Sequence, residues 1–298
     1  MKIEERLRSR LSRRNFLACL GVTAGTAAVA TMAAGCGSTP VTTTTPSTPP
    51  SGSSDEDILN FALNLEYLEA EFYLRAVTGS GLSSSNIGTN PGAVTGGSQV
   101  TFTNPAVQAY ALEIANDELL HVEFLRSTLG SAAVDRPAID LTNSFNAAAM
   151  AAGIGPAFNP FADENSFIVG AFVFEDVGVT AYHGAASLIL NKTYLGAAAG
   201  IMATEAYHAG EIRTLLNGLG APYVTYANQI SMLRAMLGGG NETPVTTESC
   251  VAEDNNCASF SRTTSEVLHI VYAAGAGVVS KGGFFPNGMN GTITSTVS

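Results

Sequence analysis

Glu-Leu-Leu-His at residues 118–121 and Glu-Ala-Tyr-His at residues 205–208 repeat one pattern, a glutamate three positions before a histidine. Three residues along an α-helix turn through 300°, so the glutamate and the histidine of each copy share one helix face. Either copy alone could be a solvated face with a contact between neighbouring turns. Because the chain holds only 4 histidines, two copies together favour one metal site built from both.

Two further glutamates lie in apolar segments that precede the two copies. Glu66 comes before the first copy, and Glu175 lies with Asp176 inside the apolar run 167–177. An acid pair in such a run is costly unless it is solvated, paired or bound to a metal. One glutamate from each of two helices and Glu-x-x-His from each of two others form the ligand set of a two-metal centre in a four-helix bundle. The predicted ligands are Glu66, Glu118, His121, Glu175, Glu205 and His208.

Apolar residues recur at helical spacing in four long segments. We expect helices over about residues 55–77, 105–129 and 163–190, and from about 194 or 197 to 216. Residues 79–104 are rich in Gly, Ser and Asn and predict a loop that could hold a short hairpin. About 35 residues separate the second helix from the third, which is enough for one long crossover along the bundle. The fold class is therefore an all-α four-helix bundle with one long crossover.

The ligand segments resemble a known family. Residues 64–66 with Tyr73, and residues 117–121, are similar to the first two ligand helices of bacterioferritin-type di-iron proteins. Glu175 and residues 205–208 resemble the third and fourth. Residues 64–73 and the C-terminal residues 282–291 resemble, more closely, the desiccation-related proteins of the ferritin-like superfamily. This resemblance implies a ferritin-like bundle at 55–220 and a C-terminal helical or irregular extension, 221–298, packed on it. It implies little about activity.

Several residues near the predicted ligands have two interpretations. Glu69 lies one turn after Glu66 and is either an alternative ligand or a neighbour of the centre. Tyr73 and Tyr182 each follow a predicted ligand glutamate by seven residues. Each could hydrogen-bond a ligand or act as a redox relay, and the alternative is an ordinary core tyrosine. Asp117 is either an outer partner of a ligand or an exposed acid. His183 is a possible extra ligand, whereas His269 follows the capping box that begins at Thr263 and is interpreted as structural.

The N-terminus has the features of an export signal. Residues 12–17 fit the twin-arginine pattern, and an Ala-, Gly- and Thr-rich apolar stretch follows at 17–34. We expect residues 1–35 to be a cleaved twin-arginine signal peptide, with a retained anchor as the alternative. The context of Cys36 resembles a lipoprotein processing site, so we expect lipidation at Cys36, or ordinary cleavage nearby. Residues 36–54 are Thr, Ser and Pro-rich and predict a linker.

Removal of residues 1–35 leaves 8 basic and 23 acidic residues, a net charge of −15. Such an acidic protein is a poor partner for nucleic acid or an anionic membrane surface. Membrane contact would come only through a lipid anchor, in the periplasm or cell envelope. After cleavage, Cys250 and Cys257 are the cysteines not used as an anchor, and in an oxidising compartment we expect a disulfide between them. The alternative is a pair of free thiols that bind metal.

The chemistry of the ligand set bounds the function. Four carboxylates and two neutral imidazoles carry a charge of −4, which two divalent cations would neutralise. We expect two iron ions, with manganese as the alternative, and oxidation chemistry with dioxygen or peroxide. The other hypotheses are a stress-protective structural protein without turnover, an iron-binding or storage protein, and a di-manganese catalase. The oligomeric state does not follow from the sequence.

Overall fold

The structure is a computed structural model that describes residues 53–247 and 249–297. The predicted signal peptide, Cys36 and nearly all of the predicted linker lie outside the described residues. In order along the chain the helices are α3 (Asp55–Thr78), α4 (Pro105–Leu129), α5 (Asn143–Ala151), α6 (Glu164–Ala171), α7 (Glu175–Ala186), α8 (Lys192–Leu219), α9 (Tyr223–Leu237) and α10 (Thr264–Val271).

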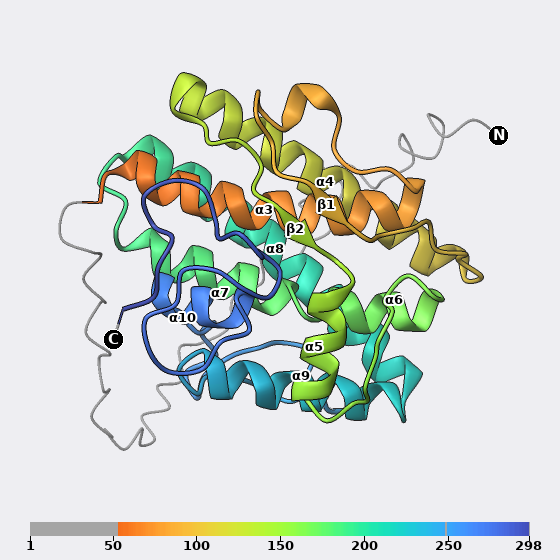
Figure 1. The fold of residues 1–298 in the computed structure, drawn as a ribbon. Coiled ribbons are helices and arrows are strands. Elements are labelled where there is room, and N and C mark those ends of the chain that lie inside the picture. The colour runs from red at the N-terminus through yellow and green to blue at the C-terminus, as the bar shows by residue number, and fades with distance from the viewer. Residues whose placement is uncertain (1–52, 248, 298) are drawn as a thin grey trace, which may run out of the picture. The chain divides into compact units, whose positions relative to one another are not determined.

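Four of these helices make the bundle. Helix α3 packs along α4, and α7 packs along α8, and the two pairs face each other through α3 with α7 and α4 with α8 (Figure 1). The crossover between α4 and α6 contains the short helix α5. The expected all-α bundle with one long crossover is confirmed.

Local sequence signals fix most helix ends. Ser54 caps α3 and forms a capping box with Asp57, and Gly79 ends the helix at a φ of 79°. Asn104 caps α4, which begins with Pro105. Asn191 caps α8, whose start at Lys192 is slightly earlier than expected because this asparagine accepts from the N–H groups of the first turn. The capping box expected at Thr263 is also present and opens α10.

The third expected helix is interrupted. Instead of one helix over 163–190, α6 and α7 are separated by a turn at residues 172–174. The backbone carbonyl of Phe172 accepts a hydrogen bond of 2.5 Å from the guanidinium of Arg234 on α9. An inserted side chain that takes a carbonyl from the helical ladder is a known cause of a helix break. The break places Glu175 in the first turn of α7.

The insertion after α3 differs from the expected hairpin. Its strand β1 (Val94–Thr95) pairs in parallel with β2 (Ile139–Asp140) in the crossover, not with a second strand of its own loop. Arg136 supports this arrangement, since its guanidinium donates to the Gly92 carbonyl at 2.6 Å. The insertion therefore fastens the crossover to the end of the bundle.

Helix α3 is the centre of the molecule. Every residue from Ile58 to Tyr73 is buried, as in a helix that is covered on all sides. One side is covered by the C-terminal segment 282–291: the Asn64 amide donates to the Asn290 carbonyl at 2.9 Å and accepts from the Asn290 N–H at 2.9 Å. In Figure 1 this segment passes in front of α3 and α7. The C-terminal residues are thus part of the core around α3.

We expect Asn64→Ala to destabilise the protein by about 1–3 kcal/mol, because the backbone N–H and C=O of Asn290 would lose their partners. Limited proteolysis should then cut the segment 282–291 faster than in the natural protein. Asn287→Ala is the matched control, because Asn287 is an exposed asparagine of the same segment. Equal protease resistance in the natural protein and Asn64→Ala would contradict this role for Asn64.

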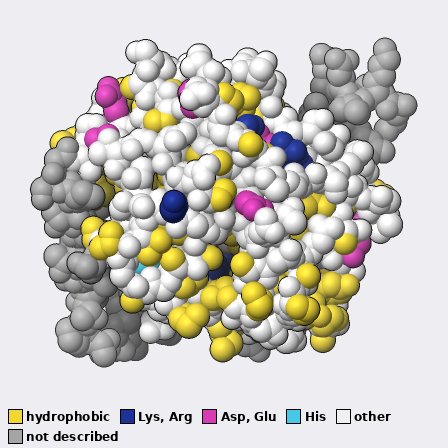
Figure 2. Space-filling model, in the orientation of Figure 1, with side chains coloured by type: hydrophobic (Ala, Val, Ile, Leu, Met, Phe, Trp, Pro, Cys, Tyr) yellow, Lys and Arg dark blue, Asp and Glu magenta, His cyan; other side chains and the backbone are white. Residues whose placement is uncertain are grey.

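The surface has few charges on the side shown in Figure 2, where hydrophobic side chains gather over the lower part that α5 and α9 occupy. Met150 of α5 and Met232 and Met236 of α9 are among the exposed large hydrophobic residues. Among the described residues, none of the helices combines the length and the hydropathy needed to cross a membrane.

Candidate metal centre

The six predicted ligands converge at the middle of the bundle. The atoms that could bind a metal form two groups. Within each group, all of these atoms lie within 4.8 Å of one another. All six side chains are buried, the most exposed being His121 at 8%. The first group is Glu66, Glu118, His121 and Glu205, and the second is Glu175, Glu205 and His208.

The histidines show how the two groups are joined. The Nδ1 atom of His121 lies 3.2 Å from Glu66, 3.6 Å from Glu118 and 3.3 Å from Glu205. The Nδ1 atom of His208 lies 3.0 Å from the other oxygen of Glu118 and 3.6 Å from Glu175. Glu118 and Glu205 therefore lie between the two positions, where they can bridge two ions. Glu66 and Glu175 lie at the two ends.

Asp117 is adjacent to this centre but outside it. Its carboxylate lies 3.3 Å from Nε2 of His208, on the side of the ring that faces away from the ligand group. A carboxylate there holds the ring in place and fixes which nitrogen is free for a metal. Of the two interpretations from the sequence, the structure favours the outer partner.

The buried oxygens test whether a metal fits. Both carboxylate oxygens of Glu118 and of Glu205, one oxygen of Glu175 and Nδ1 of His208 have no hydrogen-bond partner within the described part of the chain. Buried polar atoms are nearly always partnered, so a group of orphaned atoms around one point needs an explanation. Two divalent cations would satisfy these atoms and balance their charge. The donor set fits iron or manganese.

Without a metal, protons must balance the charge. Burial is the main cause that raises the pKa of Glu66 to about 8; the charge of His121 lowers this pKa, and repulsion from Glu118 and Glu205 raises it. Burial also raises the pKa of Glu175 and Glu205. Although burial opposes the charged form of His208, Asp117 and Glu118 raise its pKa to about 12. A metal that binds here must therefore displace protons.

Two tyrosines support the end ligands in a symmetric manner. Tyr73 follows Glu66 by seven residues but donates its hydroxyl hydrogen bond to Glu175. Tyr182 follows Glu175 by seven residues and donates to Glu66. Tyr73 of α3 thus fixes the ligand on α7, and Tyr182 of α7 fixes the ligand on α3. The hydrogen-bonding interpretation of both residues is the one that the structure shows.

Glu69 is buried beside the centre, and Gly178 lies close to both Glu69 and the bridging Glu205. A Cβ placed on Gly178 would lie 2.5 Å from Oε2 of Glu205 and 3.5 Å from Oε1 of Glu69. Glycine at this position is thus what lets α7 approach the bridging carboxylate. Glu69 does not belong to either ligand group, which favours its interpretation as a neighbour of the centre.

The expectation that His183 could be an extra ligand is wrong. Its Nδ1 atom lies 2.9 Å from the Phe260 carbonyl oxygen and 3.2 Å from the Ser259 hydroxyl, in the C-terminal extension. Eight residues along the helix rotate His183 far enough from Glu175 to face this loop. His269 contacts the Ala274 carbonyl at 3.0 Å, in keeping with a structural role.

The structure does not form the expected bridge between Cys250 and Cys257, which are both exposed and unpaired. The loop between them contains a hydrogen-bonded turn around Asp254. Asp254 accepts hydrogen bonds from the N–H groups of Asn256 and Ala258, and its carbonyl accepts from the N–H of Cys257. Cys257 has a φ of 59° in this turn.

A second buried cluster near Glu175 could not be assigned from the sequence. Asp176 accepts from Arg213 at 3.0 Å and from Arg234 at 2.8 Å, and Glu242 pairs with Arg234 and Arg262 at 2.8 Å. All five side chains are at most 7% exposed. The costly acid pair at 175–176 is thus resolved in two ways: Glu175 joins the metal centre, and Asp176 pairs with arginines.

Comparison with known proteins places the chain in a family. Residues 54–218 match the model of the ferritin-like domain. The ferritin-like catalase Nec2 of Nesocodon mauritianus is 30% identical over 270 residues, which cover 80% of this chain and 85% of Nec2. The desiccation-related protein PCC13-62 of Craterostigma plantagineum is 28% identical over 270 residues, which cover 82% of this chain and 85% of that protein. The chain belongs to the ferritin-like, desiccation-related family.

Proposed function

We propose that this chain is an exported ferritin-like protein that breaks down hydrogen peroxide at a two-metal centre. The observation that carries the proposal is the group of orphaned carboxylate oxygens between His121 and His208. The name of the relative Nec2, a ferritin-like catalase, supports peroxide as the substrate. In the proposed reaction two molecules of hydrogen peroxide give two of water and one of dioxygen, so no other reductant is needed.

The chain's own residues would divide the work. Glu118 and Glu205 would bridge two iron or manganese ions, with Glu66 and His121 at one position and Glu175 and His208 at the other. When bound, such ions supply Lewis acidity and the capacity to take up and return electrons. Tyr73 and Tyr182 hold the end carboxylates in position. The apolar surroundings exclude bulk water and larger reductants.

The location is a separate part of the proposal. We propose that residues 1–35 direct export by the twin-arginine route and that Cys36 carries a lipid anchor, which places the domain in the periplasm or cell envelope. An anionic membrane surface would repel the acidic mature chain, so contact with the membrane would come through the lipid anchor alone. Peroxide removal there would protect the envelope.

A non-enzymatic role is the second candidate. It is favoured by the similarity to the desiccation-related protein PCC13-62. In that case the ions would join four helices and stabilise the fold without turnover, as closed structural metal sites do.

The test is oxygen release from peroxide by the protein that lacks residues 1–35, loaded separately with iron and with manganese. We expect one dioxygen for every two peroxides consumed, measured with an oxygen electrode and by peroxide absorbance. The metal-free protein is the control. Peroxide consumption without dioxygen would indicate a peroxidase that needs a reductant. An absence of consumption with two ions bound would favour the structural role.

A further inference from the structure

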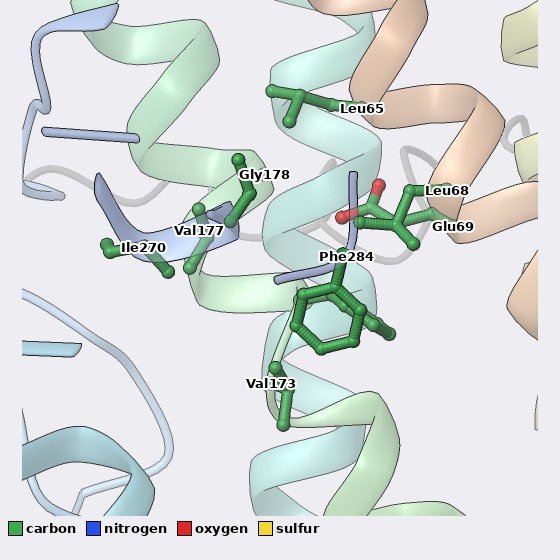
Figure 3. A pocket seen from close by; sticks show the side chains of 10 residues that line it. Leu65, Leu68, Glu69, Val173, Val177, Gly178, Ile270 and Phe284 are labelled. Carbon is green, nitrogen blue, oxygen red and sulfur yellow. The ribbon is translucent and has the colours of Figure 1, made fainter. Parts of the chain in front are cut away.

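Helix α7 carries a metal ligand but begins without the local signals that fix the other bundle helices. Residues 172–174, which separate it from α6, are Phe-Val-Phe and include neither a proline nor a side chain that can cap a helix. The N–H groups of Val173 and Phe174 bond to carbonyls three positions earlier, at 3.1 Å and 3.0 Å, as in a 3₁₀ turn. In Figure 3, Val173 lies on the stretch that leads into α7, and Val177 lies in the first turn of that helix. A partner far along the chain therefore has to fix where Glu175 begins the helix.

Arg234 of α9 is that partner. Its guanidinium donates to the Phe172 carbonyl at 2.5 Å through one nitrogen and to the Asp176 carboxylate at 2.8 Å through another. Phe172 comes three positions before Glu175, and Asp176 comes directly after it. One planar side chain with several donors thus holds the chain on both sides of the ligand. The same guanidinium lies over the ring of Phe172, 4.5 Å from its centroid.

The guanidinium of Arg234 is itself held in place. The residue is 2% exposed, and its guanidinium also pairs with Glu242 at 2.8 Å. Arg262 binds the other side of this cluster through Glu242, and Arg213 of α8 binds it through Asp176. A buried charge with this many partners has little freedom to move. Arg234 is therefore a rigid support for the start of α7.

The ligands of the two metal positions differ in how they are supported. Those of the first position lie inside α3 and α4, and Glu205 and His208 lie inside α8. Glu175 is the first residue of α7. One of its oxygens accepts from the Tyr73 hydroxyl, and the other lies 3.6 Å from Nδ1 of His208. A shift of the first turn of α7 would move this ligand and leave those of the first position where they are.

We propose that Arg234 is a positioning residue for the second metal position: by holding the chain on both sides of Glu175, it keeps that carboxylate where it can bind an ion together with His208. The inference rests on the proposed two-metal centre. The apolar sequence of residues 163–190 suits one continuous helix, and a continuous helix would send Glu175 in another direction, because a break changes the course of the residues that follow it. Helix α9 lies beyond the four-helix bundle, so the C-terminal extension would complete a site whose ligands all belong to the bundle.

The test compares two buried arginines of the same cluster. Arg234→Met removes both contacts beside Glu175. Arg262→Met is the matched control, because Arg262 is also 2% exposed and pairs with Glu242, but donates to the Thr180 hydroxyl instead. In both variants each carboxylate of the cluster still has an arginine partner. The two losses of folding stability should therefore be comparable.

The readout is manganese(II) binding to the same protein as in the peroxide test, followed by equilibrium dialysis and by electron paramagnetic resonance. We expect the natural protein and Arg262→Met to bind two ions and to give the spectrum of a magnetically coupled pair. Arg234→Met should bind the first ion with the natural affinity and the second about 10–100-fold more weakly. Its spectrum should then show the hyperfine lines of an isolated ion. A merely structural loss would weaken both ions, so the difference between the two positions identifies positioning.

Manganese binding needs no turnover, so the two proposals can fail separately. Fewer than two ions in the natural protein would refute the two-metal centre itself. Two ions bound by the natural protein, with equal losses or no loss in Arg234→Met, would overturn only the role of Arg234. Should Arg234→Met not fold, Arg234→Lys keeps the positive charge but lacks the planar fork that holds two groups at once, and it should also weaken the second ion alone. Natural affinities for both ions in Arg234→Lys would overturn the positioning role.

Discussion

Replacement of Glu118 by alanine is expected to remove most of the stability that this protein gains from iron(II) or manganese(II). Glu118 has one oxygen near each histidine of the centre, so its loss affects both metal positions. An ion present at a thousand times its dissociation constant stabilises a protein by about 4 kcal/mol per site. We therefore expect Glu118→Ala to lose at least about 4 kcal/mol of metal-dependent stability.

The measurement is the free energy of unfolding with and without metal, in both proteins. The quantity to compare is the change in the free energy of unfolding that metal causes in each protein. This comparison is needed because Glu118 also interacts with His121 and His208 when metal is absent. Burial raises the pKa of Glu118, but the two histidines lower it below the usual range. Glu123→Ala is the matched control, since Glu123 is an exposed glutamate of the same helix. Equal stabilisation by metal in Glu118→Ala and Glu123→Ala would refute the bridging role.

The same experiment has an expected pH dependence. In the metal-free folded protein the pKa of Glu66 is raised to about 8 from the ordinary 4.5. A raised carboxyl pKa means that the folded state holds a proton which the unfolded state has lost, so its contribution to stability falls as pH rises from about 4.5 to 8. Metal replaces these protons, and the stabilisation by metal should therefore grow across that range.

Asp176→Ala is expected to destabilise the protein by about 3–5 kcal/mol, because it leaves the buried Arg213 without a carboxylate and leaves Arg234 with Glu242 alone. Asp176 accepts from Arg213 and Arg234. Both guanidinium groups also lie over the ring of Phe172, at 5.7 Å and 4.5 Å from its centroid, which cannot replace a full negative charge. Chemical denaturation measures the loss.

A double mutant separates charge from packing. In Asp176→Ala, the further change Arg213→Met removes the arginine that has lost its carboxylate, so the pair of changes should be less destabilising than their sum. Glu56→Ala, an exposed acid in the first turn of α3, controls for loss of a surface carboxylate and should change stability by less than about 1 kcal/mol. Strict additivity of Asp176→Ala and Arg213→Met would show that their charges are not coupled.

The ligand groups could be predicted because they depend on spacing within single helices. Glu and His three residues apart must share a face, and the four segments have clear apolar periodicity. Ser54 and Asn104 also cap the first two of them. What the sequence could not reveal depends on partners far along the chain. The interruption at Phe172 comes from Arg234 of another helix, and β1 pairs with a strand beyond α4 instead of forming a hairpin.

Two errors came from treating local geometry too simply. The sequence allowed His183 as an extra ligand, but its Nδ1 atom lies near the Phe260 carbonyl and the Ser259 hydroxyl of the C-terminal extension. The sequence predicted a bridge between Cys250 and Cys257, but both are unpaired, and Asp254 holds the loop between them in a turn. In both places the hydrogen-bond partners cannot be predicted from the spacing of residues along the sequence.

The contact between Asn64 and Asn290 joins residues that are 226 positions apart, which has a consequence for the order in which the protein folds. The ribosome makes roughly 5–20 residues per second, so α3 would wait on the order of 10–45 s for the segment that completes its cover. Long-range contacts of this kind slow folding. Helix α3, the first described element to be synthesised, should therefore be among the last to become fully buried, and nascent chains would expose its apolar surface to chaperones until synthesis ends.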